Sequence, residues 1–133
     1  MGMPITPPIT SITRLNSTVK DLLIYLFDLS PLDVEAFFTL MKEKGPLTID
    51  ILADKLERDR TTVFRSVQKL VKQGIVMKDS RTIKDGGYYH VYSAIDKETF
   101  KLEVERKIKD IQEGFTRILK KFENDIDKVL ATF

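Results

Sequence analysis

The sequence contains no cysteine, only one histidine, and no apolar run long enough to cross a membrane. Without cysteine there are no disulfides, no thiolate nucleophile and no zinc-ribbon site, so an intracellular, cytoplasmic protein is expected. A single histidine makes no metal site by itself. The most apolar segment, residues 22–27, is far shorter than the roughly 20 residues of a membrane-spanning helix. We expect a soluble protein with no metal and no cofactor.

Motifs that indicate an enzyme are also missing. There is no glycine-rich phosphate-binding loop and no nucleophile motif, and the segment "DGG" at residues 85–87 is better explained as a turn. His90 lies among aromatic residues and has no cysteine to pair with, which favours a structural or DNA-backbone role over catalysis. We predict that the protein is not an enzyme.

The first fourteen residues hold three of the five prolines and no periodic apolar pattern. Residues 1–14 are therefore predicted to form a flexible N-terminal arm, whose prolines also interrupt any secretory signal. A chain of 133 residues suits one hydrophobic core with an appended helix. We assign the globular domain to residues 15–95 and the appended helix to residues 96–133.

Apolar residues spaced by three and four predict two helices before residue 45, over residues 17–28 and 31–44. Ser30 is placed to cap the second helix, and Pro31 suits a first helical position. The residues that we expect this second helix to bury are Val34, Phe37, Phe38 and Met41.

A helix-turn-helix pattern follows. Residues 48–57 predict a short helix, and "RDR" separates it from a second one over residues 60–73, with Asp59 as its cap and Gly74 after its end. The glycine that is usual in the turn of this motif is absent. "IVMKDSRTI" and "YYHVYSAI" then read as two strands joined by a tight turn at Asp85-Gly86. The predicted fold is mainly α-helical with a small β-hairpin, the wing, over residues 75–95.

The positive charge is local, although the whole chain carries only +2. Residues 58–95 hold eight basic and three acidic residues, a net charge of +5. The preceding part holds five basic and eight acidic residues (−3), and the following part holds nine of each (0). No acidic residue occurs between Arg60 and Lys78. Uncompensated positive charge on one helix indicates a polyanionic partner, and the major groove of B-DNA admits one α-helix.

On a helical wheel, Val63, Val67 and Leu70 form the inward side of residues 60–73, and Phe64 lies at its boundary. Arg65 suits a guanine edge and Gln68 an adenine edge. The side chains that we expect to contact phosphate are Arg58, Arg60, Lys69 and Lys72. The hydroxyls of Thr61 and Thr62 can reach a phosphate or a base edge, and the wing cations the adjacent minor groove or its phosphates. The complete predicted DNA-binding set is Arg58, Arg60, Thr61, Thr62, Phe64, Arg65, Gln68, Lys69, Lys72, and in the wing Arg81 and Lys84.

From Asp96 onward one heptad-like apolar stripe continues to the C-terminus, with a stutter between Ile118 and Ile126. A single helix of about 35 residues would be roughly 50 Å long, more than a small core covers. We therefore predict a homodimer held by this stripe. The predicted interface residues are Val104, Ile108, Ile111, Phe115, Ile118, Phe122, Ile126 and Val129.

The segment "GPLTIDILADKLERDRTTVFRSVQKLVKQGIVMK", with the hairpin and "HVYSAI" behind it, resembles the winged helix-turn-helix of small archaeal transcription regulators of the TrmB-like and MarR-like kinds. The resemblance covers residues 46–95, and its most specific part is "TTVFRSVQKLVKQGIV". The C-terminal helix is similar to the dimerisation helix of the short members. The resemblance implies double-stranded DNA as the partner. Full-length TrmB-type regulators carry a C-terminal sugar-binding domain, which this chain lacks, so a sugar effector is not implied.

Other readings remain open at this point. The same basic helix suits an architectural, weakly specific chromatin-like protein, because a side chain that reads a base also touches phosphate. An adaptor that recruits a protein through its C-terminal helix is disfavoured by the basic wing and helix. Tyr88, Tyr89 and Tyr92 could stack on single-stranded bases, although strand residues of this kind more often pack beneath a wing. The operator, the direction of regulation and any effector are not encoded in a recognisable pattern.

Overall fold

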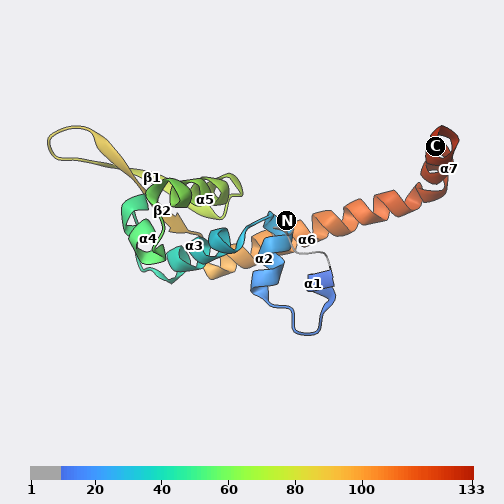
Figure 1. The fold of residues 1–133 in the computed structure, drawn as a ribbon, viewed down its shortest axis with the longest axis horizontal. Coiled ribbons are helices and arrows are strands. Elements are labelled where there is room, and N and C mark those ends of the chain that lie inside the picture. Colours follow the sequence, from blue (N-terminus) through green and yellow to red (C-terminus); the bar gives the residue numbers. More distant parts are fainter. Residues whose placement is uncertain (1–9) are drawn as a thin grey trace. The chain divides into compact units, whose positions relative to one another are not determined.

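The computed structural model describes residues 10–133, which form two compact units (Figure 1). The winged unit runs to Phe100, and the C-terminal unit comprises residues 101–133. The elements are α1 (Thr10–Thr13), α2 (Val19–Phe27), α3 (Pro31–Lys42), α4 (Ile49–Leu56), α5 (Arg60–Lys72), β1 (Val76–Thr82), β2 (Tyr88–Ala94), α6 (Lys97–Lys120) and α7 (Phe122–Thr132). This confirms the predicted mainly α-helical fold with a small hairpin and a long C-terminal helix.

The predicted arm, residues 1–14, lies mostly outside the described residues; where they overlap, Thr10–Thr13 form the short helix α1. No helix within residues 10–133 has the length and apolar character that a bilayer span requires.

Side-chain caps fix where the helices of the winged unit begin. Ser30 and Asp33 form a reciprocal cap at the start of α3: the Asp33 N–H donates to Ser30 Oγ (3.2 Å), and the Ser30 N–H donates to Asp33 Oδ2 (2.9 Å). Thr48 caps α4 and Asp59 caps α5 through the same three-residue spacing. The predicted caps Ser30 and Asp59 are confirmed.

The core of the winged unit forms where α2, α3 and α5 bring their apolar faces together. Phe27 and Phe37 are fully buried, and the Phe100 ring, from the first turn of α6, lies 5.0 Å from that of Phe37. The predicted burial of α3 was partly wrong, since Phe38 and Met41 are only half-buried. Ala36 and Leu40 are buried instead, on the same face as Val34 and Phe37.

The turn between α4 and α5 manages without glycine because Glu57 adopts the left-handed conformation, with φ 54° and ψ 46°. In this conformation the N–H groups of Glu57 and Arg58 reach back to the last turn of α4, where the Arg58 N–H donates to the Ala53 carbonyl (3.1 Å). The turn therefore has the geometry that a glycine would supply. The left-handed conformation is sterically unfavourable for a residue with a Cβ, such as Glu57.

The wing is an antiparallel hairpin in which Val76 pairs with Ala94 and Thr82 with Tyr88. Its turn differs from the predicted two-residue form. The Gly86 N–H donates to the Ile83 carbonyl (3.0 Å), so the turn centres on residues 84 and 85, and Gly86 and Gly87 follow with positive φ. At the root of the wing, Leu47 and Tyr92 exchange two backbone hydrogen bonds of 2.9 and 2.8 Å, which add a one-residue third strand.

The sequence predicts one helix from residue 96 to the end of the chain, but the structure has two, α6 and α7. The break lies at Lys121, whose φ and ψ are −111° and 16°, inside the expected stutter. The charges explain the break: α6 ends with Arg117 and Lys120 in its last turn, and α7 begins with Glu123 and Asp125 in its first. Cations stabilise a helix C-terminus and anions a helix N-terminus, so this order favours two helix ends here.

Candidate nucleic-acid interface

Helix α5 packs into the winged unit through the side that the sequence predicts to face inward. Val63, Val67 and Leu70 are completely buried, Ser66 is nearly so, and Phe64 is half-buried at the boundary. Because these residues recur every three or four positions, burying them fixes the rotation of the helix. The opposite side is consequently turned outward as a single face.

Four polar side chains form this outward face: Thr61, Arg65, Gln68 and Lys72, spaced by four, three and four. All four are exposed, and within residues 10–133 no ion pair or side-chain hydrogen bond engages them. We call them the reading face. It contains two cationic side chains, one amide and one hydroxyl. All of these groups can donate hydrogen bonds to the acceptor atoms of base edges and phosphates.

Thr62, which the sequence also predicts to contact DNA, is half-buried at the start of α5. Its hydroxyl donates to Asp59 Oδ1 (2.7 Å), and its N–H donates to Asp59 Oδ2 (3.1 Å). These two hydrogen bonds lower the pKa of Asp59 below its usual value, so the cap stays ionised. The hydroxyl proton of Thr62 is thus used to begin the helix.

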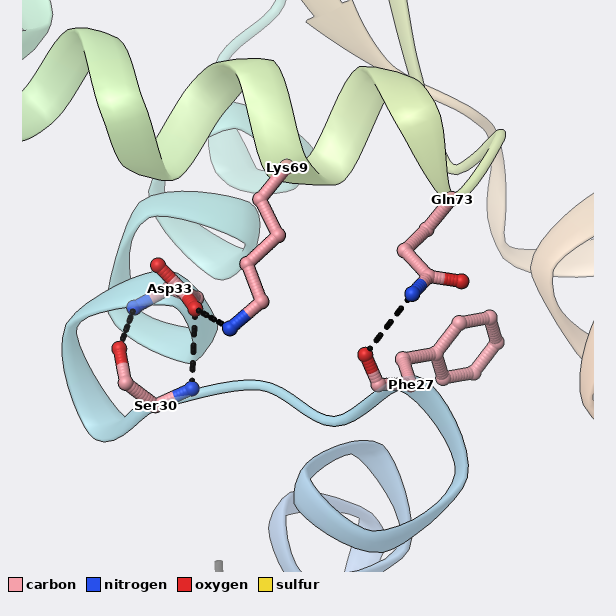
Figure 2. Close-up of polar contacts among 5 residues, drawn as sticks. All are labelled: Phe27, Ser30, Asp33, Lys69 and Gln73. Atoms are coloured by element: carbon pink, nitrogen blue, oxygen red, sulfur yellow. Dashed lines mark hydrogen bonds and ion pairs between the residues drawn. The ribbon is translucent and has the colours of Figure 1, made fainter. Parts of the chain in front are cut away.

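Lys69, which the sequence predicts to contact phosphate, makes an ion pair within the winged unit. Its Nζ lies 3.0 Å from Oδ2 of Asp33, a carboxylate at the start of α3 that is only 4% exposed (Figure 2). On the helical wheel Lys69 is on the flank shared with Ser66, which turns it toward α3 and away from the reading face. Its charge is therefore engaged inside the domain.

Asp33 was not identified from the sequence as a functional residue. Burial by itself raises the pKa of this carboxyl, but hydrogen bonds from the Ser66 hydroxyl, the Ser30 N–H and Lys69 outweigh it and leave the pKa below its usual value. The carboxylate is thus ionised and joins the start of α3 to the middle of α5. The sequence "SPLD" signals the cap but not the partner on a helix more than thirty residues away.

A second tie holds the end of α5. The side-chain amide of Gln73 donates to the carbonyl oxygen of Phe27, the last residue of α2 (3.1 Å; Figure 2). This carbonyl is one of those that a helix end leaves without a partner. Lys69 therefore connects one flank of α5 to α3, and Gln73 connects the same flank to α2.

Arg60 is also paired, with its Nε 2.8 Å from Oδ1 of Asp50 on α4. Both side chains are largely exposed, so this pair is weaker than that of Lys69. The absence of acids between Arg60 and Lys78 had suggested wholly uncompensated charge. That inference was wrong for two cations, because acids from α3 and α4 reach α5 from outside the segment. Arg58 is exposed and donates to the Glu57 carbonyl beside it (3.3 Å).

In the wing, Arg81 and Lys84 are exposed, and Arg81 makes only a long contact of 3.7 Å with Asp79. Tyr88 and Tyr89 are exposed, whereas Tyr92 is buried at the root, which raises its pKa. His90 lies beside the Ser80 hydroxyl (3.3 Å) and the Tyr88 ring. A hollow of about 600 Å³ separates this strand from the start of α5, with Arg60 and Phe64 on its helical side.

The predicted dimer residues divide into two groups. Val104, Ile108 and Ile111 are half-buried in the single chain. The others remain exposed by 43–54%; these are Phe115, Ile118, Phe122, Ile126 and Val129.

Comparison with protein-family models identifies one family. The family model for "Sugar-specific transcriptional regulator TrmB" matches residues 23–98, more than half of the chain. The chain is 36% identical over 110 residues to the uncharacterized protein MJ1503 of Methanocaldococcus jannaschii, covering 83% of this chain and 80% of that protein. It is 32% identical over 79 residues to MJ1082 of the same organism, covering 59% and 64%.

Solved structures show the same fold. A possible transcriptional regulator from Methanosarcina mazei Go1 superposes with a TM-score of 0.72 at 22% identity, covering 83% of this chain and 95% of that one. The ST1889 protein of Sulfolobus tokodaii superposes with a TM-score of 0.59 at 22% identity, covering 71% and 92%.

Proposed function

The chain belongs to the TrmB family of transcriptional regulators, and from this premise we propose that it is a sequence-specific, homodimeric regulator that inserts α5 into the major groove of double-stranded DNA. Family and fold are those of DNA-binding transcriptional regulators. Insertion of α5 into the major groove, preference for one DNA sequence and association of two chains are what we propose in addition. A regulator of this kind works where the DNA is, which in cells of its archaeal relatives is the cytoplasm.

The reading face carries this proposal. Arg65, Gln68 and Lys72 project from a helix whose rotation is fixed by a buried side, and whose flank is tied down by Lys69 and Gln73. Because the rotation of α5 is already fixed, contact with base edges does not require the helix backbone to be ordered, which favours specific over diffuse binding. This arrangement argues against the architectural alternative.

The remaining cations have positioning roles in the proposal. Lys72, near the C-terminal end of α5, contacts phosphate, and so do Arg58 and Arg60 at its start, where Arg60 exchanges Asp50 for DNA. Arg81 and Lys84 in the wing contact the adjacent minor groove or its backbone. Such contacts set the register of the helix but carry little sequence information.

The test separates base reading from phosphate contact. The preferred site is first selected from genomic fragments, and binding is then measured on it and on random DNA over a range of salt concentrations. We expect Arg65→Ala to cost about 1–3 kcal/mol on the preferred site and much less on random DNA. Lys72→Ala should weaken both equally and lower the slope of log affinity against log salt by about one unit per contact.

Lys20→Ala is the matched control, because it removes an exposed cation from α2 and leaves α5 intact. It should change neither affinity nor slope. Equal losses on both DNAs for Arg65→Ala would favour the architectural protein. Unchanged binding by both α5 variants would mean that the reading face is only a solvated surface.

A further inference from the structure

The C-terminal unit exposes an apolar stripe on both sides of the helix break at Lys121. Phe115 and Ile118 at the end of α6, Phe122 at the break, and Ile126 and Val129 on α7 are each about half exposed. Phe133, the last residue, continues the stripe. Large apolar side chains aligned in this way indicate a surface that another chain covers.

The stripe has a centre at Phe122. Counted outward from this residue, the apolar positions recur after four, three and four residues in both directions, at Ile118, Phe115 and Ile111 on one side and at Ile126, Val129 and Phe133 on the other. The two steps of four that meet there form the stutter of the heptad pattern. A second copy must align its own stutter with this one if both stripes are to interdigitate. Phe122 then lies on the two-fold axis.

The charges on either side of Phe122 have opposite sign. Residues 114–121 contain Arg117, Lys120 and Lys121 and no acid, whereas residues 123–130 contain Glu123, Asp125, Asp127 and a single cation, Lys128. Within the described residues the only ion pair among these groups joins Lys121 to Asp125, at 3.8 Å on the surface. Each side is therefore left with unneutralised charge of one sign.

The basic side also contains a shallow depression of about 560 Å³, lined by Gly114, Arg117, Ile118, Lys120 and Lys121. An antiparallel copy centred on Phe122 brings residues 123–130 opposite this depression. Those residues supply three carboxylates around Ile126, which matches three cations around Ile118.

We propose that two chains associate through their C-terminal units in an antiparallel arrangement whose two-fold axis passes at Phe122, with the basic end of α6 on the acidic α7 of the partner. The proposal rests on the proposed homodimer and specifies its direction and register. A parallel pair in the same register would set cations against cations and acids against acids. Opposite charges across an interface favour the antiparallel pair and reject the parallel one.

Cysteine crosslinking of the full chain tests the direction, and the natural chain has no cysteine to interfere. Residues must approach to about 4–7 Å between Cα atoms to form a disulfide. Under a mild oxidant, Phe122→Cys should crosslink with itself. Ile118→Cys and Ile126→Cys should each remain uncrosslinked alone and should crosslink when co-expressed with different tags. Lys109→Cys, exposed and off the stripe, is the control that should not react.

The outcomes separate this inference from the proposed function. Self-crosslinking of Ile118→Cys in a dimer would establish a parallel pair and overturn the inference, with the homodimer intact. A dimer in which no stripe cysteine reacts would place the interface elsewhere and also overturn it. A monomer in sedimentation would overturn both the direction and the homodimer, and DNA reading would still be judged by the Arg65 test. As a second readout, the antiparallel dimer should weaken as salt is raised, whereas a parallel one should strengthen.

Discussion

Asp33 shows how a single carboxylate can join the start of one helix, α3, to the middle of another, α5. It is nearly inaccessible to water, and it accepts hydrogen bonds from the Ser30 N–H, the Ser66 hydroxyl and Lys69. A buried carboxylate with three donors holds its partners in defined positions. Lys69 is consequently held beside α3 while its side chain stays 40% exposed, and the reading face is narrower than the row of cations in the sequence suggests.

We expect Asp33→Asn to lower the free energy of unfolding by about 1–3 kcal/mol at neutral pH, since the amide carries no charge to pair with Lys69 and has one acceptor oxygen where the carboxylate has two. Lys69 is 40% exposed and can turn to water, which keeps the loss below that of a fully buried pair. Urea unfolding measures the change. Asp50→Asn removes the exposed acid of the Arg60 pair and serves as the control, with an expected loss below about 1 kcal/mol.

The pH dependence follows from the lowered pKa of Asp33. A carboxyl whose pKa is lower in the folded chain stabilises the fold above its unfolded pKa, near 4, and this contribution is lost as the pH falls through the folded pKa. The stability difference between the wild type and Asp33→Asn should therefore be constant from pH 5 to 7 and should shrink below pH 4. A difference that grows on acidification would contradict an ionised Asp33.

At the scale of elements, the sequence predicted what depends on local periodicity. The phase of α5, its Asp59 cap and both wing strands followed from spacing and residue type, and Val63, Val67 and Leu70 are buried as predicted. The partners of Lys69 and Arg60 could not be predicted, because Asp33 and Asp50 reach α5 only through tertiary packing. Glu57 could not be predicted either, since nothing in its residue type favours a left-handed turn.

This turn gives a prediction about α4 and α5. Glu57→Gly should raise the free energy of unfolding by about 0.5–1 kcal/mol, because glycine adopts positive φ without a steric penalty. Glu57→Ala is the matched control: it also removes the carboxylate but retains the Cβ, so it should not stabilise the chain. Denaturant unfolding of the three proteins side by side measures the difference. Equal stability of the glycine and alanine variants would show that the turn is unstrained.

At the scale of the whole molecule, the chain forms two compact units that the sequence distinguishes by pattern. The stripe indicated an interface, but the break at Lys121 was missed, because the apolar spacing continues through it while the charges favour two helix ends. The spacing of apolar residues predicts which side of a helix is apolar, but it does not predict the residue at which a helix ends. The order of charges held the missing signal.

Replacing Ile111 and Phe115 by glutamate should separate the proposed dimer, since charge would be buried in the stripe. The control pair Gln112→Glu and Thr116→Glu has the same spacing on the adjacent flank and should leave the dimer intact. Sedimentation at micromolar concentration gives the oligomeric state, and circular dichroism checks that the helices persist. A double stripe variant that still dimerises would show that the stripe is not the interface.

The Leu47–Tyr92 bridge determines where the hydrogen bonds of the wing open most easily. Val76 is buried on the root side of the bridge and Val91 one residue beyond it, whereas residues 79–89 toward the tip are all exposed. A two-stranded ribbon without a packed face is only marginally stable. The amide protons of the wing should therefore exchange with solvent along a gradient, slowest at Leu47 and Tyr92 and fastest toward Gly86. Contact with DNA at the tip would be registered as a slowing of exchange that begins at the fast end and leaves the root unchanged.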